Sequence, residues 1–263
     1  MMRGPLAFAL LLALAVTGLC PVSAEPQPGE EVQSDISTRE IPIKSTFTGI
    51  EIVVFGAIDN SRMPAPGQGP YDVIMVIGGP PEAIVTRRKE RVAGIWINGA
   101  SQAFVTVPSF YALLSSREID DITSTEELKT LGIGIENLRF GRSAAEGDIP
   151  ADEFRDALIR LKREENLFQQ HEDGVSFIGR SLFRGTVDLP AAVPVGPYTA
   201  QVFLFRDGTL LSTSESNLHV HKVGFERVVY LLAFRYPFIY GLLAVVLAVM
   251  TGLLAWAAFG RRS

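Results

Sequence analysis

Two histidines on alternate residues are the first candidates for chemistry. His219 and His221 flank Val220 in a segment whose composition predicts a strand. Because alternate residues of a strand share a face, two imidazoles there could bind one divalent metal ion. A stable site needs a third or fourth ligand, which only His171 or a carboxylate could supply. A pair of exposed histidines without a metal is therefore favoured, and no cofactor is expected.

A cluster of cations between two predicted strands is the second candidate. Arg87, Arg88, Lys89 and Arg91 place four positive charges within five residues of a chain whose formal net charge is −5. Such a patch could contact lipid phosphates, an anionic small molecule or an acidic partner surface. A solvated hairpin end is the alternative.

Catalytic motifs are missing from the sequence. It contains no Gly-x-Ser-x-Gly, no glycine-rich phosphate loop and no His-Glu-x-x-His. Adjacent carboxylates such as Asp120 and Asp121 are interpreted as solvated surface. The one cysteine, Cys20, lies in a predicted signal peptide, so disulfides and thiolate metal sites are not expected. The acidic balance argues against nucleic-acid binding, and the chain is not expected to be an enzyme.

The first 24 residues have the three parts of a signal peptide. Arg3 gives a positive start, Leu6–Leu19 is almost entirely apolar, and Val22 and Ala24 are the small residues that precede a cut. The apolar stretch is shorter than the roughly 20 residues that a membrane span needs. We expect cleavage after Ala24 and a mature domain outside the cytoplasm.

The C-terminal part predicts one transmembrane helix. Pro237–Phe259 carries no charged residue, and at about 1.5 Å per residue it is roughly 34 Å long, enough to cross a bilayer. Tyr240 and Trp256 lie near its two ends, where amphipathic rings favour the headgroup region. Arg261 and Arg262 follow at once and predict a short cytoplasmic tail over 260–263.

A second apolar run precedes this span, and one bilayer cannot hold both. We expect residues 225–236 to be a juxtamembrane interfacial segment, with a short helix over Phe225–Arg235, and Pro237 to begin or kink the span. Within the span, Ala244, Ala248 and Gly252 recur every fourth residue and form a stripe that another helix could approach closely. The expected partners are the bilayer and a membrane protein or a second copy of the chain.

The body between the two ends reads as a β-sandwich. Short runs rich in Val, Ile, Phe and Tyr alternate with turn residues over 41–224. The most informative run places Tyr198, Ala200, Val202 and Leu204 on one face and ends in an Asp207-Gly208 turn. It resembles the penultimate strand of an immunoglobulin-like sandwich. Another turn is expected at Asn98-Gly99.

Helical patterns interrupt the strands over about 118–170. Ser124 or Thr125 can cap a short helix that ends at Leu131, and Asp152–Phe168 has one apolar face. We interpret this part as a helical insertion in a single domain, although a split into two small domains within 116–173 is open. Residues 25–40 are rich in Pro, Gln, Glu and Ser and are expected to be a flexible leader.

Several long motifs resemble one family. They are VFGAI at 54–58, YDVIMVIGGP at 71–80, RRKERVAGIWIN at 87–98, VPSFYALLSSR at 107–117, SLFRGTVDLPAAVPVGPYTAQVFLFRDG at 181–208 and YGLLAVVLAVMTGLLAW at 240–256. Over Ile41–Phe259 the chain resembles the putative transmembrane protein family of alphaproteobacteria. The resemblance carries over no catalytic residues, and it implies an accessory role at a transport system such as a sulfite exporter-like permease.

Two classes of function follow. The favoured one is a periplasmic binding or scaffolding protein, held in the bacterial inner membrane by a single span, with its N-terminal domain in the periplasm. The alternative is a periplasmic enzyme with an unrecognised active site. The missing bases and nucleophiles favour the first class.

Overall fold

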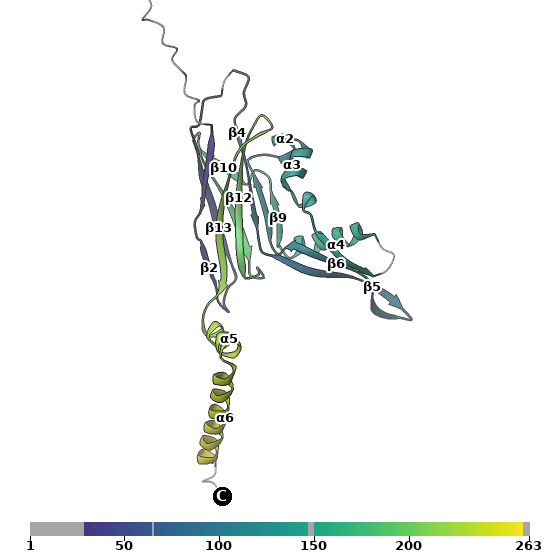
Figure 1. Cartoon of the computed structure of the whole chain (residues 1–263), viewed down its shortest axis with the longest axis vertical. Coiled ribbons are helices and arrows are strands. Elements are labelled where there is room, and N and C mark those ends of the chain that lie inside the picture. Colours follow the sequence, from purple (N-terminus) through teal and green to yellow (C-terminus); the bar gives the residue numbers. More distant parts are fainter. Residues whose placement is uncertain (1–28, 65, 147–149, 260–263) are drawn as a thin grey trace, which may run out of the picture.

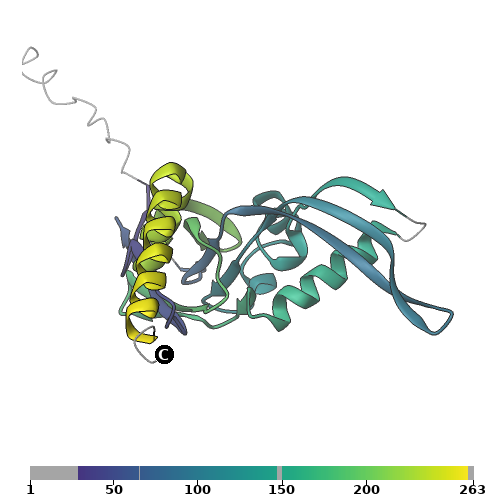
Figure 2. The same cartoon turned by 90° about the horizontal axis from the view of Figure 1, so that it is seen from below.

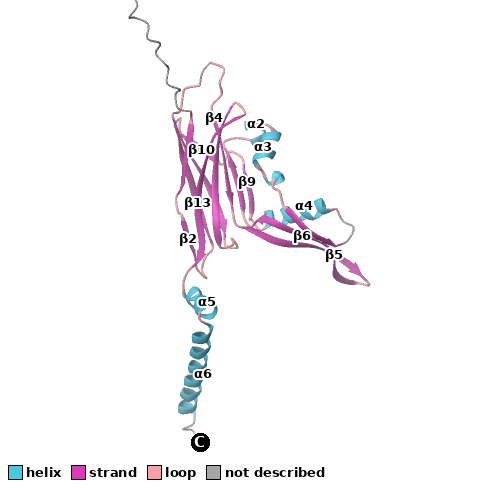
Figure 3. Cartoon of the chain, in the orientation of Figure 1, coloured by secondary structure: helices cyan, strands magenta, loops and turns pink. Residues whose placement is uncertain are grey.

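The computed structural model of the protein describes residues 29–64, 66–146 and 150–259. Three β-sheets make up most of this part, and two consecutive helices extend from one end of it (Figures 1 and 3). The mainly β class expected from the sequence is confirmed. The predicted signal peptide over 1–24 and the predicted tail over 260–263 lie outside the described residues.

Two sheets form the body, and strands of one contact strands of the other. The four-stranded sheet is antiparallel in the order β1-β3-β11-β10. The six-stranded sheet has the order β2-β13-β12-β4-β7-β9 and is parallel only in its two edge pairs. The bounds are β1 Glu31–Ile36, β2 Glu40–Ile43, β3 Gly49–Asp59, β4 Tyr71–Gly78, β7 Tyr111–Ser115, β9 Phe168–His171, β10 Val175–Ile178, β11 Leu182–Pro190, β12 Gly196–Arg206 and β13 Thr209–Lys222.

The core of the body follows the alternation read from the sequence. Tyr198, Ala200, Val202 and Leu204 on β12 are all at most 1% exposed, as predicted. Ile52 on β3, in the other sheet, belongs to the same buried cluster. Fully burying an aliphatic side chain of this size stabilises a fold by about 1.5–3 kcal/mol relative to leaving it exposed. The two sheets are therefore held together by their facing apolar side chains.

A helical segment connects β7 to β9. It contains α2 (Ile119–Ile122), α3 (Thr125–Leu131), the 3-10 turn η1 (Ile135–Asn137), strand β8 (Gly141–Glu146) and α4 (Ala151–Glu164). The Ser124 hydroxyl caps α3 by accepting a hydrogen bond from the Glu127 amide, as predicted. The α4 helix ends at Glu164, before the predicted limit, because Phe168 is taken into β9 beside β7.

A third sheet projects sideways as an arm (Figures 1 and 2). It consists of β5 (Pro81–Val92), β6 (Ile95–Pro108) and β8, with β6 in the centre. The predicted turn at Asn98-Gly99 is wrong, because Asn98 lies inside β6 opposite Lys89. The hairpin instead turns at Ala93 and Gly94, whose φ angles of 51° and 85° are typical of the tight two-residue turns that suit twisted strands.

The expected flexible leader over 25–40 is wrong for its second half. Residues 31–36 form β1, in which Val32 and Ile36 are 3% and 4% exposed. Ser34, which lies between them, is hydrogen-bonded within the protein: its amide and its hydroxyl both bond the Ser214 hydroxyl on β13. The polar composition of this segment indicates disorder, whereas in the structure Ser34 bonds across the sandwich to Ser214, 180 residues away in the sequence.

The two C-terminal helices have the predicted bounds. The α5 helix spans Phe225–Arg235 and α6 spans Pro237–Phe259. In the described part of the chain, α6 is the one helix long and apolar enough to cross a membrane, with a mean hydropathy of 2.4 over Pro237–Trp256. It is not buried against the rest of the chain, so its apolar surface is available to lipid or to another helix.

A hydrogen bond at the start of β12 generates a first prediction. The buried Tyr198 hydroxyl donates to the Pro194 carbonyl over 2.6 Å. Tyr198→Phe should lower the free energy of unfolding by about 1–2 kcal/mol, because it leaves that carbonyl without its partner. The measurement is chemical denaturation of the full chain in detergent micelles, followed by near-ultraviolet circular dichroism. Tyr230→Phe, on an exposed ring, is the control; equal stability of the two variants would contradict the assignment.

The same residue generates a second prediction at high pH. Burial raises the pKa of Tyr198 to about 12, and burial likewise raises the pKa of Tyr111 to about 12, from a usual value near 10. The unfolded chain then loses these protons first, so stability is full below pH ~10 and falls as the pH rises towards ~12. Tyr198→Phe should show a shallower fall than the unaltered chain in denaturation midpoints measured across this window. Parallel curves would count against it.

Candidate functional site

The predicted cation cluster lies on the arm. Arg87, Arg88, Lys89 and Arg91 are exposed residues of β5. They follow one another along the strand and approach the hairpin turn, instead of forming the turn itself as expected. None of them forms an ion pair within the described residues. Their charge is therefore available to an external anion.

The end of the same hairpin carries exposed apolar side chains that the sequence did not reveal. Val92 is 52% exposed, Ile95 68%, Trp96 65% and Ile97 45%. In the register of the hairpin, Val92 is opposite Ile95 and Arg91 is opposite Trp96. We call Val92–Ile97 the arm tip. The arginine opposite the exposed tryptophan, and the exposed Val92 and Ile95 beside them, are typical of a binding surface.

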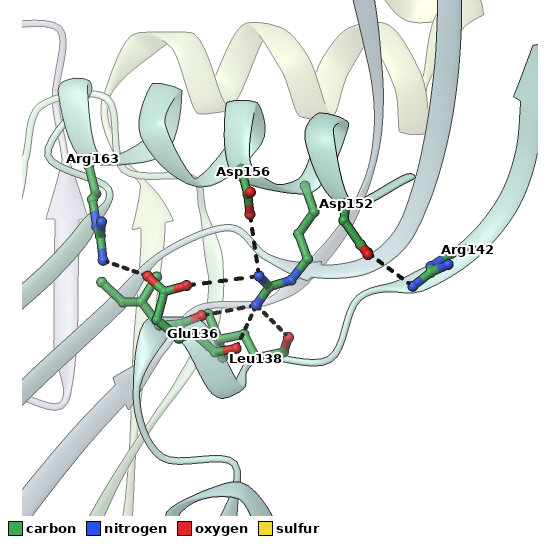
Figure 4. Close-up of polar contacts among 8 residues, drawn as sticks. Glu136, Leu138, Arg142, Asp152, Asp156 and Arg163 are labelled. Carbon is green, nitrogen blue, oxygen red and sulfur yellow. Dashed lines mark hydrogen bonds and ion pairs between the residues drawn. The ribbon is translucent and has the colours of Figure 1, made fainter. Parts of the chain in front are cut away.

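Polar contacts hold α4 against the segment that leads into β8 (Figure 4). Arg155 of α4 donates to the Glu136 carbonyl over 2.7 Å and to the Leu138 carbonyl over 3.4 Å. Its guanidinium also lies 5.5 Å from the centre of the Phe140 ring. Arg163 reaches the Glu136 carboxylate over 3.2 Å. Arg155 is only 21% exposed, so water competes little for its hydrogen bonds. These bonds to backbone carbonyls therefore fix the orientation of α4.

A second contact fixes α4 to the base of the arm. The Lys162 ammonium is 2.5 Å from the Glu82 carboxylate on β5 and also donates to the Ser109 carbonyl. The Lys162 side chain is 8% exposed, whereas that of Glu82 is 36% exposed, so the ammonium is shielded from water and the carboxylate only partly. The arm is thus a braced sheet, and not a loose hairpin.

Among the described residues, the histidine pair has no third ligand positioned with it to hold a metal ion. His219 and His221 share a face of β13 as predicted, with ring centroids 6.3 Å apart. The Glu40 carboxylate lies 3.9 Å from His221 Nδ1, and His171 is on β9 at the other edge of the sheet. Within the described residues, no group of three or more His, Cys, Asp or Glu side chains could hold a metal ion.

The small-residue stripe lies along α6. Ala244, Ala248 and Gly252 are all exposed, and a methyl group added at Gly252 would meet no atom within 4 Å apart from its chain neighbours and the backbone of its own helix. The stripe is therefore open along its length.

A pocket that sequence analysis missed opens at the end of the body opposite α5. Its volume is about 780 Å³. Its lining comes from the β3–β4 connection, with Arg62 and Met63, and from Tyr71 at the start of β4. Phe177 of β10 and Arg180 of the following turn complete it. These segments are over 100 residues apart in sequence, so no local motif indicates the pocket.

A buried ion pair forms the base beneath the pocket. Arg206 on β12 donates to the Glu30 carboxylate over 2.7 Å, and the two side chains are 7% and 13% exposed. The Tyr71 hydroxyl donates to the same carboxylate, and its ring lies 3.8 Å from the Arg206 guanidinium carbon. Arg206 also donates to the Arg62 carbonyl. The wall residues Tyr71 and Arg62 are thereby fixed from below.

The lining of the pocket combines positive charge with apolar surface. Two arginines and apolar side chains suit a ligand with an anionic group and an apolar part. The described residues that line it include no histidine, cysteine or carboxylate. Nearby, Asp72 accepts two hydrogen bonds from Arg117, and this contact raises the pKa of the Arg117 guanidinium.

The buried pair generates a third prediction. Glu30→Ala should destabilise the full chain by about 3 kcal/mol, because it leaves the Arg206 charge buried without a partner. Glu31→Ala is the matched control, since this neighbouring side chain is exposed and has no ion pair in the described part; its cost should stay within about 0.5 kcal/mol. Both are measured by denaturant titration in micelles. Equal costs would show that the pair does not support the pocket.

The sequence comparison agrees with this anatomy. Residues 31–261 match the family described as putative transmembrane protein (Alph_Pro_TM), which covers β1 through the end of α6. No curated protein and no solved structure matches the chain. The candidate sites therefore rest on the geometry of this chain alone. The match spans most of the sequence, and the chain belongs to this alphaproteobacterial family of transmembrane proteins.

Proposed function

We propose that the protein is a membrane-anchored binding or scaffolding protein that acts beside a membrane transport system, such as a sulfite exporter-like permease. The observation that carries this proposal is the direct mounting of the body on the span. Only Val223 and Gly224 separate β13 from α5, and only Tyr236 separates α5 from α6. Because these short connections keep the body close to the bilayer, a partner of the body is expected at the same membrane surface.

The position of the pocket supports a binding role. The β3–β4 connection that lines it lies at the end of the body farthest from α6 (Figure 1), where a solute can enter without crossing lipid. Its wall contains Arg62 and Arg180, whose charges favour an anionic solute. The described lining offers no histidine, cysteine or carboxylate to activate a nucleophile, which supports a role other than catalysis.

We further propose that the body is an immunoglobulin-like sandwich. Its strand orders, β1-β3-β11-β10 and β2-β13-β12-β4-β7-β9, resemble the two sheets of variable-type domains. The Tyr198 hydroxyl bonds the carbonyl four residues upstream at the start of β12, as the tyrosine of such domains does before the last hairpin. The parallel β7–β9 pair and the arm are departures from that pattern.

The proposed location is the inner membrane, with the body in the periplasm. The predicted signal peptide and the arginine pair after α6 support this orientation. The uncovered stripe of α6 is the proposed contact with the permease or with a second copy of the chain.

A fourth prediction tests the partnership. Ala248→Leu should reduce the recovery of a membrane-protein partner at least about fivefold, because a leucine separates two closely packed helices. The measurement is quantitative mass spectrometry of complexes purified from gently solubilised membranes. Val246→Leu, on the opposite face of α6, is the matched control. Mass photometry of the same samples distinguishes a second copy from a different protein.

Two results would overturn the proposed function. One is isolation of the unaltered chain as a monomer with no integral membrane protein enriched beside it. The other is turnover of a substrate by that isolated monomer, which would favour an enzyme.

A further inference from the structure

The geometry points to the arm tip, Val92–Ile97, as a second membrane contact of this chain. We propose that it inserts its apolar side chains at the surface of the bilayer that α6 crosses, while the neighbouring cations bind the phosphates of anionic phospholipids. This contact is separate from the α6 stripe and from the pocket, and it does not depend on the proposed function.

The position of the arm is the first argument. Figure 1 shows the arm descending from the body towards the end that carries α5, so that its tip lies near the level of α5. Figure 2, seen from below, shows the tip displaced sideways from α6 and towards the same edge of the view as the C-terminal end of α6. A bilayer surrounding α6 extends sideways from it, and the arm reaches in the same direction. The tip is therefore close to the plane of the lipid headgroups.

The side chains of the tip suit that position. Trp96 and Ile95 are the most exposed large apolar residues of the arm, at 65% and 68%. In water this exposure is unfavourable, whereas indole rings favour the boundary between headgroups and acyl chains. The tight turn at Ala93 and Gly94 joins the ends of β5 and β6 and places Val92 and Ile95 side by side. Few residues therefore have to enter the lipid.

The charges supply the complementarity to lipid. Arg91 lies opposite Trp96 at the tip, while Arg87, Arg88 and Lys89 lie farther up β5. When the apolar tip enters the bilayer, the cations behind it lie at the level of the lipid phosphates and can bind them. The chain as a whole is acidic, so this local positive charge is not part of a general basic surface. It favours an anionic bilayer over a neutral one.

The bracing of the arm makes the contact effective. The Lys162–Glu82 pair and the bonds of Arg155 hold α4 against the base of the arm. The hairpin beyond α4 is thus presented in a fixed direction. A rigid element loses little conformational freedom on binding, which favours a contact made by a few side chains.

The test uses the fluorescence of Trp96 in single-protein nanodiscs. The chain has two tryptophans, so Trp256→Phe leaves Trp96 as the only one. Full-length protein is placed in nanodiscs of phosphatidylglycerol and phosphatidylcholine, with part of the lipid brominated near the headgroup. We expect a blue-shifted emission relative to detergent and quenching by the brominated lipid. With one protein in each disc, the blue shift cannot come from burial of Trp96 against a partner protein.

Two variants in this background separate the apolar and the charged contributions. Val92→Asp with Ile95→Asp should abolish the quenching. Arg88→Gln with Lys89→Gln should reduce it markedly in discs that contain phosphatidylglycerol and have little effect in pure phosphatidylcholine. Lys129→Gln with Arg160→Gln removes the same charge from exposed helix positions and should leave quenching unchanged. Far-ultraviolet circular dichroism checks that every variant is folded.

The proposal is overturned if Trp96 in the folded protein is unquenched, with the same emission in anionic discs as in detergent. Such a result would leave the tip free for a protein partner. Quenching that is identical in neutral and anionic discs would overturn the role of the cations. Recovery of no membrane partner with the unaltered chain, together with quenching of Trp96, would contradict the proposed function alone, so the two proposals fail separately.

Discussion

The shortness of the connection between the body and the span is the constraint on which the molecule depends. Val223 and Gly224 join β13 to α5, and Tyr236 joins α5 to α6. Gly224 has a φ of 106°, a conformation that side chains rarely adopt, so the sharp change from strand to helix favours glycine there. Because no long linker intervenes, the orientation of the body relative to the bilayer is coupled to α6. The outward direction of the pocket and the level of the arm both follow from this coupling.

Elements with a clear periodicity could be predicted from the sequence. The bounds of α5 and α6 and the buried face of β12 agree with the structure because composition and alternation determine them locally. The strand β1 was missed because its polar residues are satisfied by Ser214, far away in sequence. The position of the hairpin turn was missed because Asn-Gly is the stronger local signal, although the chain turns at Ala93 and Gly94.

The candidate sites divide in the same way. The cations of β5 are adjacent in sequence and were recognised, but the exposure of Trp96 depends on the arm extending beyond α4. The pocket depends on Arg62 and Arg180, which meet only after β3 and β11 have paired. Its base, the Glu30–Arg206 pair, joins two residues 176 positions apart. Long-range pairing of this kind leaves no pattern within a short window of sequence.

The pairing of β13 has a mechanical consequence. This strand leads directly towards the membrane and is bonded to β12 along most of its length, while His219–Lys222, at its membrane end, also pair with β2. A pull on the span acts along the strand, parallel to its neighbours. Many ladder hydrogen bonds then share the load in shear and must break together, instead of opening one after another. The anchor is therefore attached in a geometry that resists unfolding of the body when the span is pulled along β13.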